Sequence, residues 1–419
     1  MVSEGTSQRF NLFQRMMLRW RELHPYNPVH VLCVPRPLDA QRLHQAIAAV
    51  LESQGLTGLQ VDQRRGRYRY AGGAADVDLR IVDAAGDAAD VLRHVVEQEF
   101  NRPFVHGARE NPWRFVAIDE QRAFRLALAY DHYVAGGESV ARLLTRLAHV
   151  LLGDDGASPV PLPSPAADGS ARYRHAFVRH PGWLLRALLG LPRLVGQARR
   201  VFRPAAASAD ERRNAYRAVS VDAVQTLALR AAAKDAGVTL HELLTACLLL
   251  ALSPLHPQRH AQPRRNALAV ASIMSIRRDL GPQARHGLSP FLAAYRVTHR
   301  VPDGTALRAL ADDVHRQTRR VQRDRLYLLS LVGLSLSAWL WPHLTPRQRD
   351  GFYAKHFPVQ AGITSIDMNR LWADAGSAAP DIDYQRAVPT GPLCPLVLAV
   401  TQVRDELRLG IAFRTGVYS

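Results

Sequence analysis

Residues 122–152 constrain the fold of this chain most, because their pattern changes from that of a strand to that of a helix within one segment. Large side chains alternate with small or polar ones, which predicts a strand with one bulky face, formed by Phe124, Leu126, Leu128 and Tyr130. The chain then turns at Gly136 and Gly137. Apolar side chains next recur at helical spacing, at Val140, Leu143, Leu144, Leu147 and Leu151. The segment therefore predicts a strand–turn–helix unit.

His132 lies where this predicted strand ends. Its parity is that of the bulky face, whereas Asp131 continues the parity of the other face. Strand exits are places where a rigid scaffold presents functional groups, and an imidazole there takes up a proton near neutral pH. A lone histidine is, however, more often a core side chain that a backbone carbonyl satisfies. The pattern alone leaves both interpretations open.

Helix and strand patterns interleave along the 419 residues, which favours an α/β (α+β) fold. Patterns typical of helices occur at 38–53, 87–100, 220–237 and 238–253, and strand patterns occur at 113–119, 122–131 and from 266 onward. Residues 395–414 predict a terminal hairpin with its turn at 404–406. Because 47% of the residues are hydrophobic, the chain has enough apolar material for two lobes of about 200 residues each.

Residues 153–170 form the clearest linker, because they are rich in Gly, Pro, Ser and Asp. We therefore expect an N-terminal lobe over residues 1–165, a basic crossover over residues 166–210 and a C-terminal lobe over residues 211–419.

The net charge of +17 comes almost entirely from arginine and favours acidic partners, such as coenzyme A, an acidic carrier protein or an anionic membrane. No zinc-finger spacing or other nucleic-acid motif occurs, so nucleic acid is the least favoured partner. The three cysteines, Cys33, Cys247 and Cys394, have no metal-binding spacing, so no metal site is predicted. The odd number and wide spacing of the cysteines and the lack of a signal-like N-terminus favour a cytoplasmic protein.

Two segments have the composition of membrane-contacting elements. Residues 171–203 interleave arginines with Trp183 and several leucines and contain no acid, which suits an amphipathic element on an anionic bilayer. A helical connection packed across the lobes would have the same composition, and Pro192 is expected to break the helix. Residues 326–341 are apolar but shorter than the about 20 residues of a membrane span, which favours a core or groove-lining helix over shallow insertion. A peripheral association with the inner membrane thus remains an alternative.

The turn after the predicted strand reads DHYVAGG over residues 131–137 and resembles the HHxxxDG signature of the condensation-domain superfamily. That superfamily includes wax ester synthases, polyketide-associated acyltransferases and chloramphenicol acetyltransferase. The catalytic histidine of the signature matches His132 and its last glycine matches Gly137. Asp131 replaces the first histidine and Gly136 replaces the aspartate. Further segments resemble the family in the same order, at 38–56, 100–118, 237–252, 271–281, 364–372 and 395–419.

The resemblance implies a pseudo-dimer of two chloramphenicol-acetyltransferase-like lobes, each a mixed sheet with flanking helices, with a tunnel between them. His132 would be the general base of an acyl transfer from a phosphopantetheine thioester to a hydroxyl or amine, in lipid or secondary-metabolite biosynthesis. The backbone N–H of Gly136 or Gly137, or a side chain such as Ser365, would stabilise the oxyanion. The supporting or tunnel-lining residues that the resemblance implies are Tyr130, Ser365, Asn369 and Arg277.

The departure at Gly136 leaves two functional interpretations open. The family aspartate makes a structural ion pair, so its arginine partner, for which Arg277 and Arg278 are the candidates, would have lost its acid. One interpretation is an active transferase with an altered loop, acting as a monomer on acyl-CoA or an acyl carrier protein as substrate and with no bound cofactor. The other is a catalytically inactive protein that binds an acyl chain or a carrier protein.

Overall fold

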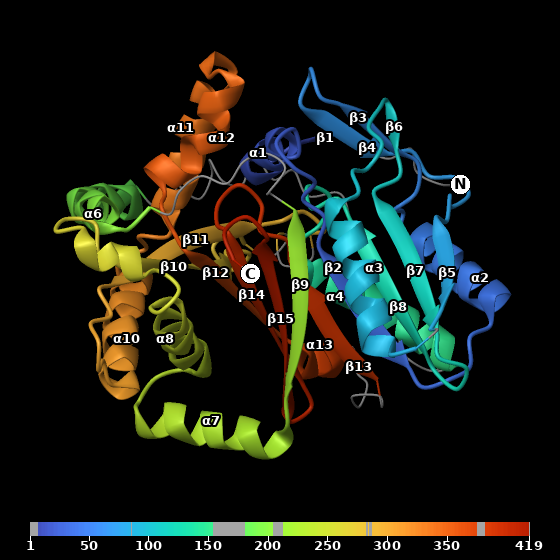
Figure 1. Ribbon diagram of the computed structural model, residues 1–419. Coiled ribbons are helices and arrows are strands. Elements are labelled where there is room, and N and C mark those ends of the chain that lie inside the picture. Colours follow the sequence, from blue (N-terminus) through green and yellow to red (C-terminus); the bar gives the residue numbers. More distant parts are fainter. Residues whose placement is uncertain are drawn as a thin grey trace.

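Two lobes lie side by side in the computed structural model, which describes residues 7–84, 86–153, 181–203, 213–281, 284, 287–374 and 382–418 (Figure 1). Most of the predicted linker at 153–170 and the first residues of the basic segment, 171–180, lie outside these ranges. The three lobe and crossover boundaries therefore stay a prediction.

The first lobe is built on a five-stranded sheet with the order β13-β2-β8-β7-β5. Only β5 and β7 pair in parallel. The strands are β2 (Val29–Val34), β5 (Leu79–Asp83), β7 (Trp113–Asp119), β8 (Phe124–Tyr130) and β13 (Asp383–Ala387). The flanking helices are α2 (Ala40–Ser53), α3 (Ala88–Asn101) and α4 (Gly137–Leu152).

The alternation in β8 distributes its side chains between the two faces of this sheet. Leu126, Leu128 and Tyr130 pack in the same core as the buried stripe of α4, whereas Ala127 and Ala129 pack with α3. The small side chains thus face one helix, and the large ones contribute to the main core of the lobe. The strand–turn–helix unit predicted from residues 122–152 is confirmed.

A small sheet and an N-terminal helix adjoin the first lobe. The sheet has the order β1-β4-β3-β6, and its strands are β1 (Gln8–Arg9), β4 (Arg67–Tyr70), β3 (Leu59–Asp62) and β6 (Arg109–Glu110). Helix α1 (Leu12–Trp20) begins with a capping box between Asn11 and Gln14 and packs against α11 (Leu328–Leu340) of the other lobe.

The second lobe is built on a six-stranded sheet with the order β11-β10-β12-β14-β15-β9. Its central pairs, β10–β12 and β12–β14, are parallel and the outer pairs are antiparallel. The strands are β9 (Asn214–Val221), β10 (Leu268–Ser275), β11 (Leu292–His299), β12 (Ala361–Asp367), β14 (Leu396–Val403) and β15 (Glu406–Arg414). Its helices include α7 (Ala223–Asp235), α8 (Leu240–Leu252), α10 (Leu307–Arg323), α12 (Pro346–His356) and α13 (Met368–Asp374).

Strand β13 ties the two lobes together, because it follows the second lobe's β12 in sequence but pairs with β2 in the first lobe's sheet. It also lies against β15, where a Cβ at Gly410 would overlap the carbonyl group of Arg386. Only glycine permits this approach of the two backbones. An ion pair between Arg408 and Asp383, with 2.9 Å between Nε and Oδ2, joins the same two strands.

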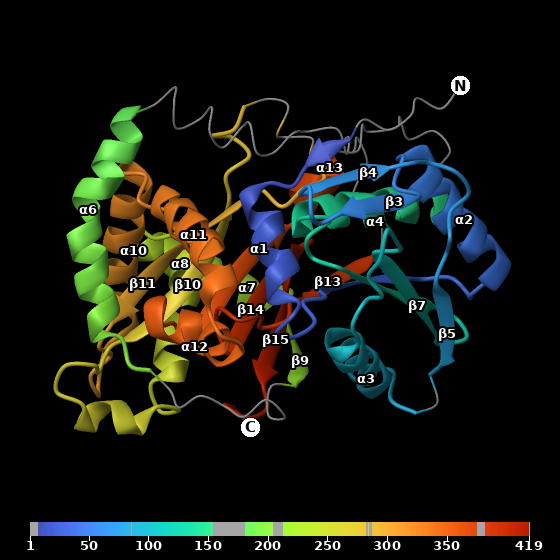
Figure 2. The ribbon, with the colours of Figure 1, turned by 90° about the horizontal axis from the view of Figure 1, so that it is seen from above.

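Helix α6 (Pro181–Arg200) corrects one expectation from the sequence, because it continues through Pro192 instead of ending there. A proline removes one hydrogen bond but does not end a helix that has packing partners on either side of it. Seen from above, α6 lies at the end of the molecule remote from the first lobe, where it packs against α11 (Figure 2).

Candidate functional site

The ring of His132 is held in one orientation by the turn between β8 and α4. Its Nδ1 lies 3.1 Å from the carbonyl oxygen of Ala135, and its backbone N–H donates to the carbonyl of Tyr26. The rings of Tyr26 and Tyr130 pack against it at centroid distances of 5.0 and 5.7 Å. Because a carbonyl only accepts, Nδ1 carries the proton of the neutral ring and Nε2 keeps its lone pair.

Burial keeps this imidazole neutral. His132 is only 7% exposed. Burial lowers its pKa to about 4, and this effect is larger than the opposing effect of the hydrogen bond to Ala135. At neutral pH the ring is therefore an uncharged proton acceptor. Protonating it in this environment is costly unless an anion forms nearby at the same moment.

Gly136 lies against the arginine that the resemblance pointed to. A Cβ built on Gly136 would lie 3.5 Å from Nη2 of Arg277, whereas the side chain of Arg278 is exposed. Arg277 donates to Ser139 Oγ and to the carbonyls of Ala284, Gly287 and Ser289. The guanidinium of Arg277 thus still connects the start of α4 to residues 284 and 287–289.

The two glycines of the turn differ in their backbone bonds. The N–H of Gly136 donates to the carbonyl of Leu288 at 3.2 Å, so it is already engaged. Gly137 is the first residue of α4, where N–H groups have no partner within the helix and the helix dipole favours negative charge. Of the two backbone N–H groups expected as oxyanion donors, that of Gly137 is the better placed.

Asp131 belongs to a different cluster. Its Oδ2 lies 3.2 Å from Nη1 of Arg21, which also approaches Glu110, and Tyr133 donates to Glu110 at 2.6 Å. Burial raises the pKa of Asp131, while Arg21 opposes that shift. Asp131 therefore helps to anchor the turn by binding Arg21, a contact that the strand parity alone did not indicate.

A buried polar group on the other side of Gly137 escaped the sequence analysis. A Cβ at Gly137 would lie 3.6 Å from Nη1 of Arg386 and 3.7 Å from Cε1 of His30. His30 hydrogen-bonds to Tyr384 through Nδ1, and its buried Nε2 has no hydrogen-bond partner in the described part of the chain. Burial, the charge of Arg386 and His132 all lower the pKa of His30. Nothing in the local pattern of β2 distinguishes His30, because its neighbours come from remote strands.

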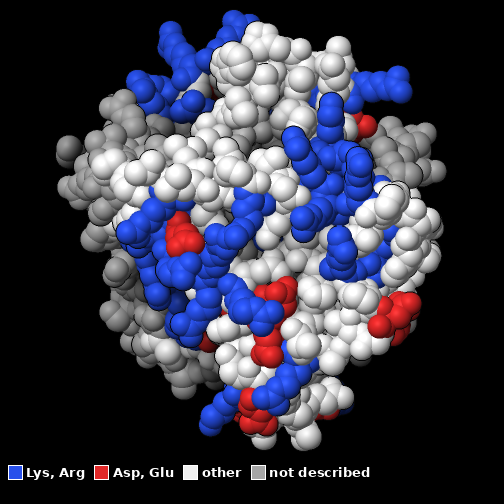
Figure 3. Space-filling model, turned by 90° about the vertical axis from the view of Figure 1, so that its left-hand side faces the viewer, with Lys and Arg blue, Asp and Glu red and all other residues white. Residues whose placement is uncertain are grey.

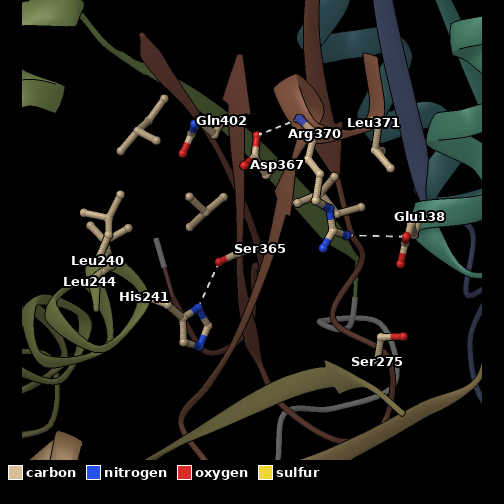
Figure 4. Close-up of a pocket in the computed structure, with 13 residues that line it drawn as sticks. Glu138, Leu240, His241, Leu244, Ser275, Ser365, Asp367, Arg370, Leu371 and Gln402 are labelled. Carbon is tan, nitrogen blue, oxygen red and sulfur yellow. Dashed lines mark hydrogen bonds and ion pairs between the residues drawn. The ribbon is translucent and has the colours of Figure 1, made fainter. Parts of the chain in front are cut away.

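A cavity of about 350 Å³ lies between the start of α4, the start of α8 and strand β12 (Figure 4). Its polar lining consists of Glu138, His241, Ser275, Ser365, Asp367, Arg370 and Gln402, and Ile366 connects it to Gly137. Arg370 reaches across it to Glu138 at 3.5 Å. His132 is not among the residues that line this cavity.

His241 is the second imidazole of this region and was also missed. It bridges two serines, with Nδ1 2.9 Å from Ser365 Oγ and Nε2 2.8 Å from Ser272 Oγ. Burial lowers the pKa of His241, so the ring is neutral at pH 7. The available signal was a histidine in the first turn of a mostly apolar helix.

The remaining predicted site residues separate into two groups. Ser365 lines the cavity, and Tyr130 is buried between the rings of His132 and His30. Asn369 instead holds the turn between β14 and β15, because its side chain donates to the Arg404 carbonyl and accepts from the Arg404 N–H, both at 2.7 Å. Asn369 does not line the cavity.

The two segments with membrane-like composition come together in the fold, because α6 packs against α11. Both expose apolar side chains: Leu189 of α6 is 75% exposed and Trp339 of α11 is 68% exposed. Within the described ranges, no single helix has the length and apolar character needed to cross a membrane, although two sharply bent helix pairs have both.

Comparison with solved structures relates this architecture to condensation domains. The first condensation domain of the CDA synthetase has a TM-score of 0.67 at 15% identity, covering 99% of this chain and 92% of that chain. The condensation domain of the Monacolin K polyketide synthase MokA has a TM-score of 0.69 at 14% identity, covering 100% and 94%. A variant starter condensation domain of the rhizomide synthetase RzmA, in complex with C8-CoA, has a TM-score of 0.66 at 13% identity, covering 99% and 90%. No family model and no curated protein matches the sequence.

These similarities confirm the fold that the DHYVAGG segment predicted, that of the condensation domains with their two chloramphenicol-acetyltransferase-like lobes. The similarity extends over the whole chain, although the sequence identities are low.

Proposed function

We propose that this protein is an acyltransferase that moves an acyl group from a phosphopantetheine thioester to a hydroxyl or amine, with His132 as the general base. The observation that supports this most is the bond between Nδ1 of His132 and the Ala135 carbonyl, which leaves Nε2 as a lone-pair acceptor. The fold is that of proteins such as the RzmA starter domain, which was solved with C8-CoA.

The reaction proceeds through a tetrahedral intermediate. The acceptor gives its proton to Nε2 of His132 while its oxygen or nitrogen attacks the thioester carbonyl. The N–H of Gly137, at the positive end of α4, stabilises the negative charge on the carbonyl oxygen. The C–S bond then breaks, and the imidazolium returns the proton to the leaving thiolate.

The replacement of the motif aspartate by Gly136 is compatible with this mechanism. Arg277 keeps acceptors for its guanidinium in Ser139 and in the carbonyls of Gly287 and Ser289. The turn that carries His132 is therefore held without a carboxylate at residue 136, and the loss of the motif aspartate leaves the base in place.

Thiol release from acyl-CoA and acyl carrier protein donors, measured with a set of alcohols and amines, tests this proposal. His132→Ala should reduce the rate by roughly 10²–10⁴-fold, which is typical for the loss of a general base. His94→Ala, which changes an exposed histidine on α3, is the matched control and should retain full activity. Equal rates for these two variants would rule out His132 as the base.

The alternative is a catalytically inactive protein that binds a carrier protein or an acyl chain. The altered motif at Gly136 favours it, and the X-domain from teicoplanin biosynthesis, which has a TM-score of 0.58 to this chain, was solved as a complex with OxyB. This function predicts salt-sensitive binding of acyl carrier protein without thiol release, because the chain is strongly basic.

We also propose that the same protein binds to the surface of a membrane. The exposed Leu189 and Trp339, together with the arginines of α6, suit shallow binding to an anionic bilayer. Flotation with phosphatidylglycerol vesicles should recover the protein, and Leu189→Gln should reduce recovery. Leu227→Gln, at a leucine of α7 that is also exposed, is the control. Failure to float would exclude the membrane without affecting the acyl transfer.

A further inference from the structure

A second cavity, of about 260 Å³, lies between α6, α10 and β11, in the lobe that does not carry His132. Arginines line it from three elements: Arg193 from α6, Arg296 from β11, and Arg316 and Arg320 from α10. No aspartate or glutamate is among its lining residues. Figure 3 shows the corresponding face of the molecule, where lysine and arginine side chains outnumber the acidic ones. We call this cavity the arginine pocket.

The wall that α6 provides is tightly packed. A Cβ at Gly190 would lie 2.6 Å from Cδ2 of Leu326, so α6 packs closely on this side chain, which lies just after α10. Leu194 and Gln197 continue this wall one and two turns further along the helix. The shape of the arginine pocket is therefore set by packing and not by a surface loop.

Arg296 is the unusual residue of this pocket. It is only 8% exposed, and one of its nitrogens, Nη2, donates to the carbonyl of Leu194 at 3.1 Å. Its Nε and Nη1 are buried and have no hydrogen-bond partner in the described ranges. Burial lowers the pKa of Arg296 to about 10, so it remains charged at neutral pH. A buried guanidinium with no carboxylate beside it is unfavourable, and an anion bound next to it in the pocket would offset that cost.

The other guanidiniums are only partly neutralised. Arg316 pairs with Asp313 at 3.0 Å, and Arg320 approaches Asp324 at 3.7 Å, but both acids lie outside the pocket lining. Arg193 and Arg296 have no ion-pair partner among the described residues. The pocket thus combines an excess positive charge with a buried guanidinium, that of Arg296, which no acid among the described residues neutralises.

We propose that the arginine pocket binds the phosphate group of a phosphorylated ligand, with Arg296 at its base and Arg193, Arg316 and Arg320 at its rim. Guanidinium groups match phosphate oxygens in geometry, and several of them around one concave site favour a multiply charged anion over chloride. The ligand is either a soluble phosphate ester or the headgroup of an anionic phospholipid, since both present the same group. This inference does not depend on the acyl-transfer proposal.

Calorimetric titration with inorganic diphosphate, at ionic strength matched with sodium chloride, tests this inference on the full chain. We expect saturable binding to one site that is about tenfold or more weaker in Arg296→Met. Arg316→Gln, an exposed position, should weaken it as well without affecting folding. Arg122→Gln removes the same charge from the exposed turn after β7 and is the control that should bind like the unaltered chain.

Vesicles distinguish the two sources of phosphate. Competition by phosphatidylglycerol vesicles, but not by phosphatidylcholine vesicles, would assign the pocket to a lipid headgroup, and no competition would assign it to a soluble ester. Two results would overturn the inference: absence of saturable diphosphate binding, or an equal loss of binding in Arg122→Gln and Arg296→Met.

Discussion

Gly136 and Arg277 are neighbours across the turn that carries His132, and a Cβ on Gly136 would lie 3.5 Å from Nη2 of the arginine. Gly136 is also the N-cap of α4, with φ −85° and ψ 154°, a backbone conformation open to any residue. It provides no side-chain cap. A carboxylate at this position would gain both an arginine partner and the first-turn N–H groups of a helix.

We therefore predict that Gly136→Asp stabilises the fold, by about 1–2 kcal/mol. Chemical denaturation measures this as a rise in the midpoint at unchanged slope. Gly136→Asn is the control, because it provides the cap without the charge and should give the smaller part of the gain. Destabilisation by both substitutions would show that Pro290, 3.5 Å from the same Cβ, leaves no room for a side chain.

The pH dependence of activity should reflect the buried state of His132. Because burial lowers its pKa from 6.5 to about 4, the ring stays unprotonated well below neutral pH. The kcat/KM profile for thiol release should therefore remain flat from pH 8 to about pH 5, since it reports the free enzyme. An inflection near pH 6.5 would contradict this placement of the ring.

The same shift predicts how His132 affects stability. Its pKa is lower in the folded than in the unfolded state, so between these values the unfolded chain binds more protons and stability falls as the pH falls. The free energy of unfolding is unaffected by protonation of His132 above pH 6.5. Between pH 6.5 and about pH 4 it falls progressively, by roughly 3 kcal/mol at most. In His132→Gln this part of the pH dependence should disappear from urea unfolding curves.

His241 offers a comparison with His132, because both rings are neutral and close to the junction of the lobes. His241 bonds to two serines and lines the cavity together with Ser365, so its loss should alter acceptor binding and not the proton transfer. We expect His241→Ala to lower kcat/KM by up to about tenfold, mainly through KM. A loss as large as that of His132→Ala would instead assign the base to His241.

Local patterns predicted the parts of the structure that depend on local interactions. The alternation from Phe124 to Tyr130 and the stripe from Val140 to Leu151 each match one element, and both elements formed where expected. The position of His132 at the strand exit followed directly from them. The interpretation of Pro192 rested on the same local pattern and was wrong, because the packing of α6 against α11 outweighs one missing hydrogen bond.

Contacts between remote segments could not be predicted in this way. His30 and Tyr384 are 354 residues apart in sequence, yet share a hydrogen bond because β13 pairs with β2. Arg21 and Asp131 meet for a similar reason, through the packing of the residues after α1 against the turn. A single sequence contains no pattern for such pairings, since each side chain lies in an ordinary local context.

Arg386 shows how the lobes are joined by a buried charge. From β13 in the first lobe's sheet it donates to Thr401 Oγ, to the Val400 carbonyl at 2.8 Å and to the Thr364 carbonyl at 3.2 Å, all in the second lobe. No carboxylate forms an ion pair with it among the described residues. Burial lowers the pKa of Arg386 to about 10, so the guanidinium remains charged at neutral pH.

The loss in free energy of unfolding on replacing Arg386 should therefore depend on whether the new side chain is charged. Arg386→Lys keeps a buried charge but loses the fork geometry that reaches three acceptors, and should destabilise by about 3 kcal/mol or more. Arg386→Met loses the same hydrogen bonds but also removes the desolvated charge, so it should cost less. Urea unfolding followed by tryptophan fluorescence gives both values. If Arg386→Met lowers the free energy of unfolding as much as Arg386→Lys, the hydrogen bonds of Arg386 outweigh the cost of burying its charge. The arginine would then stabilise the contact between the lobes.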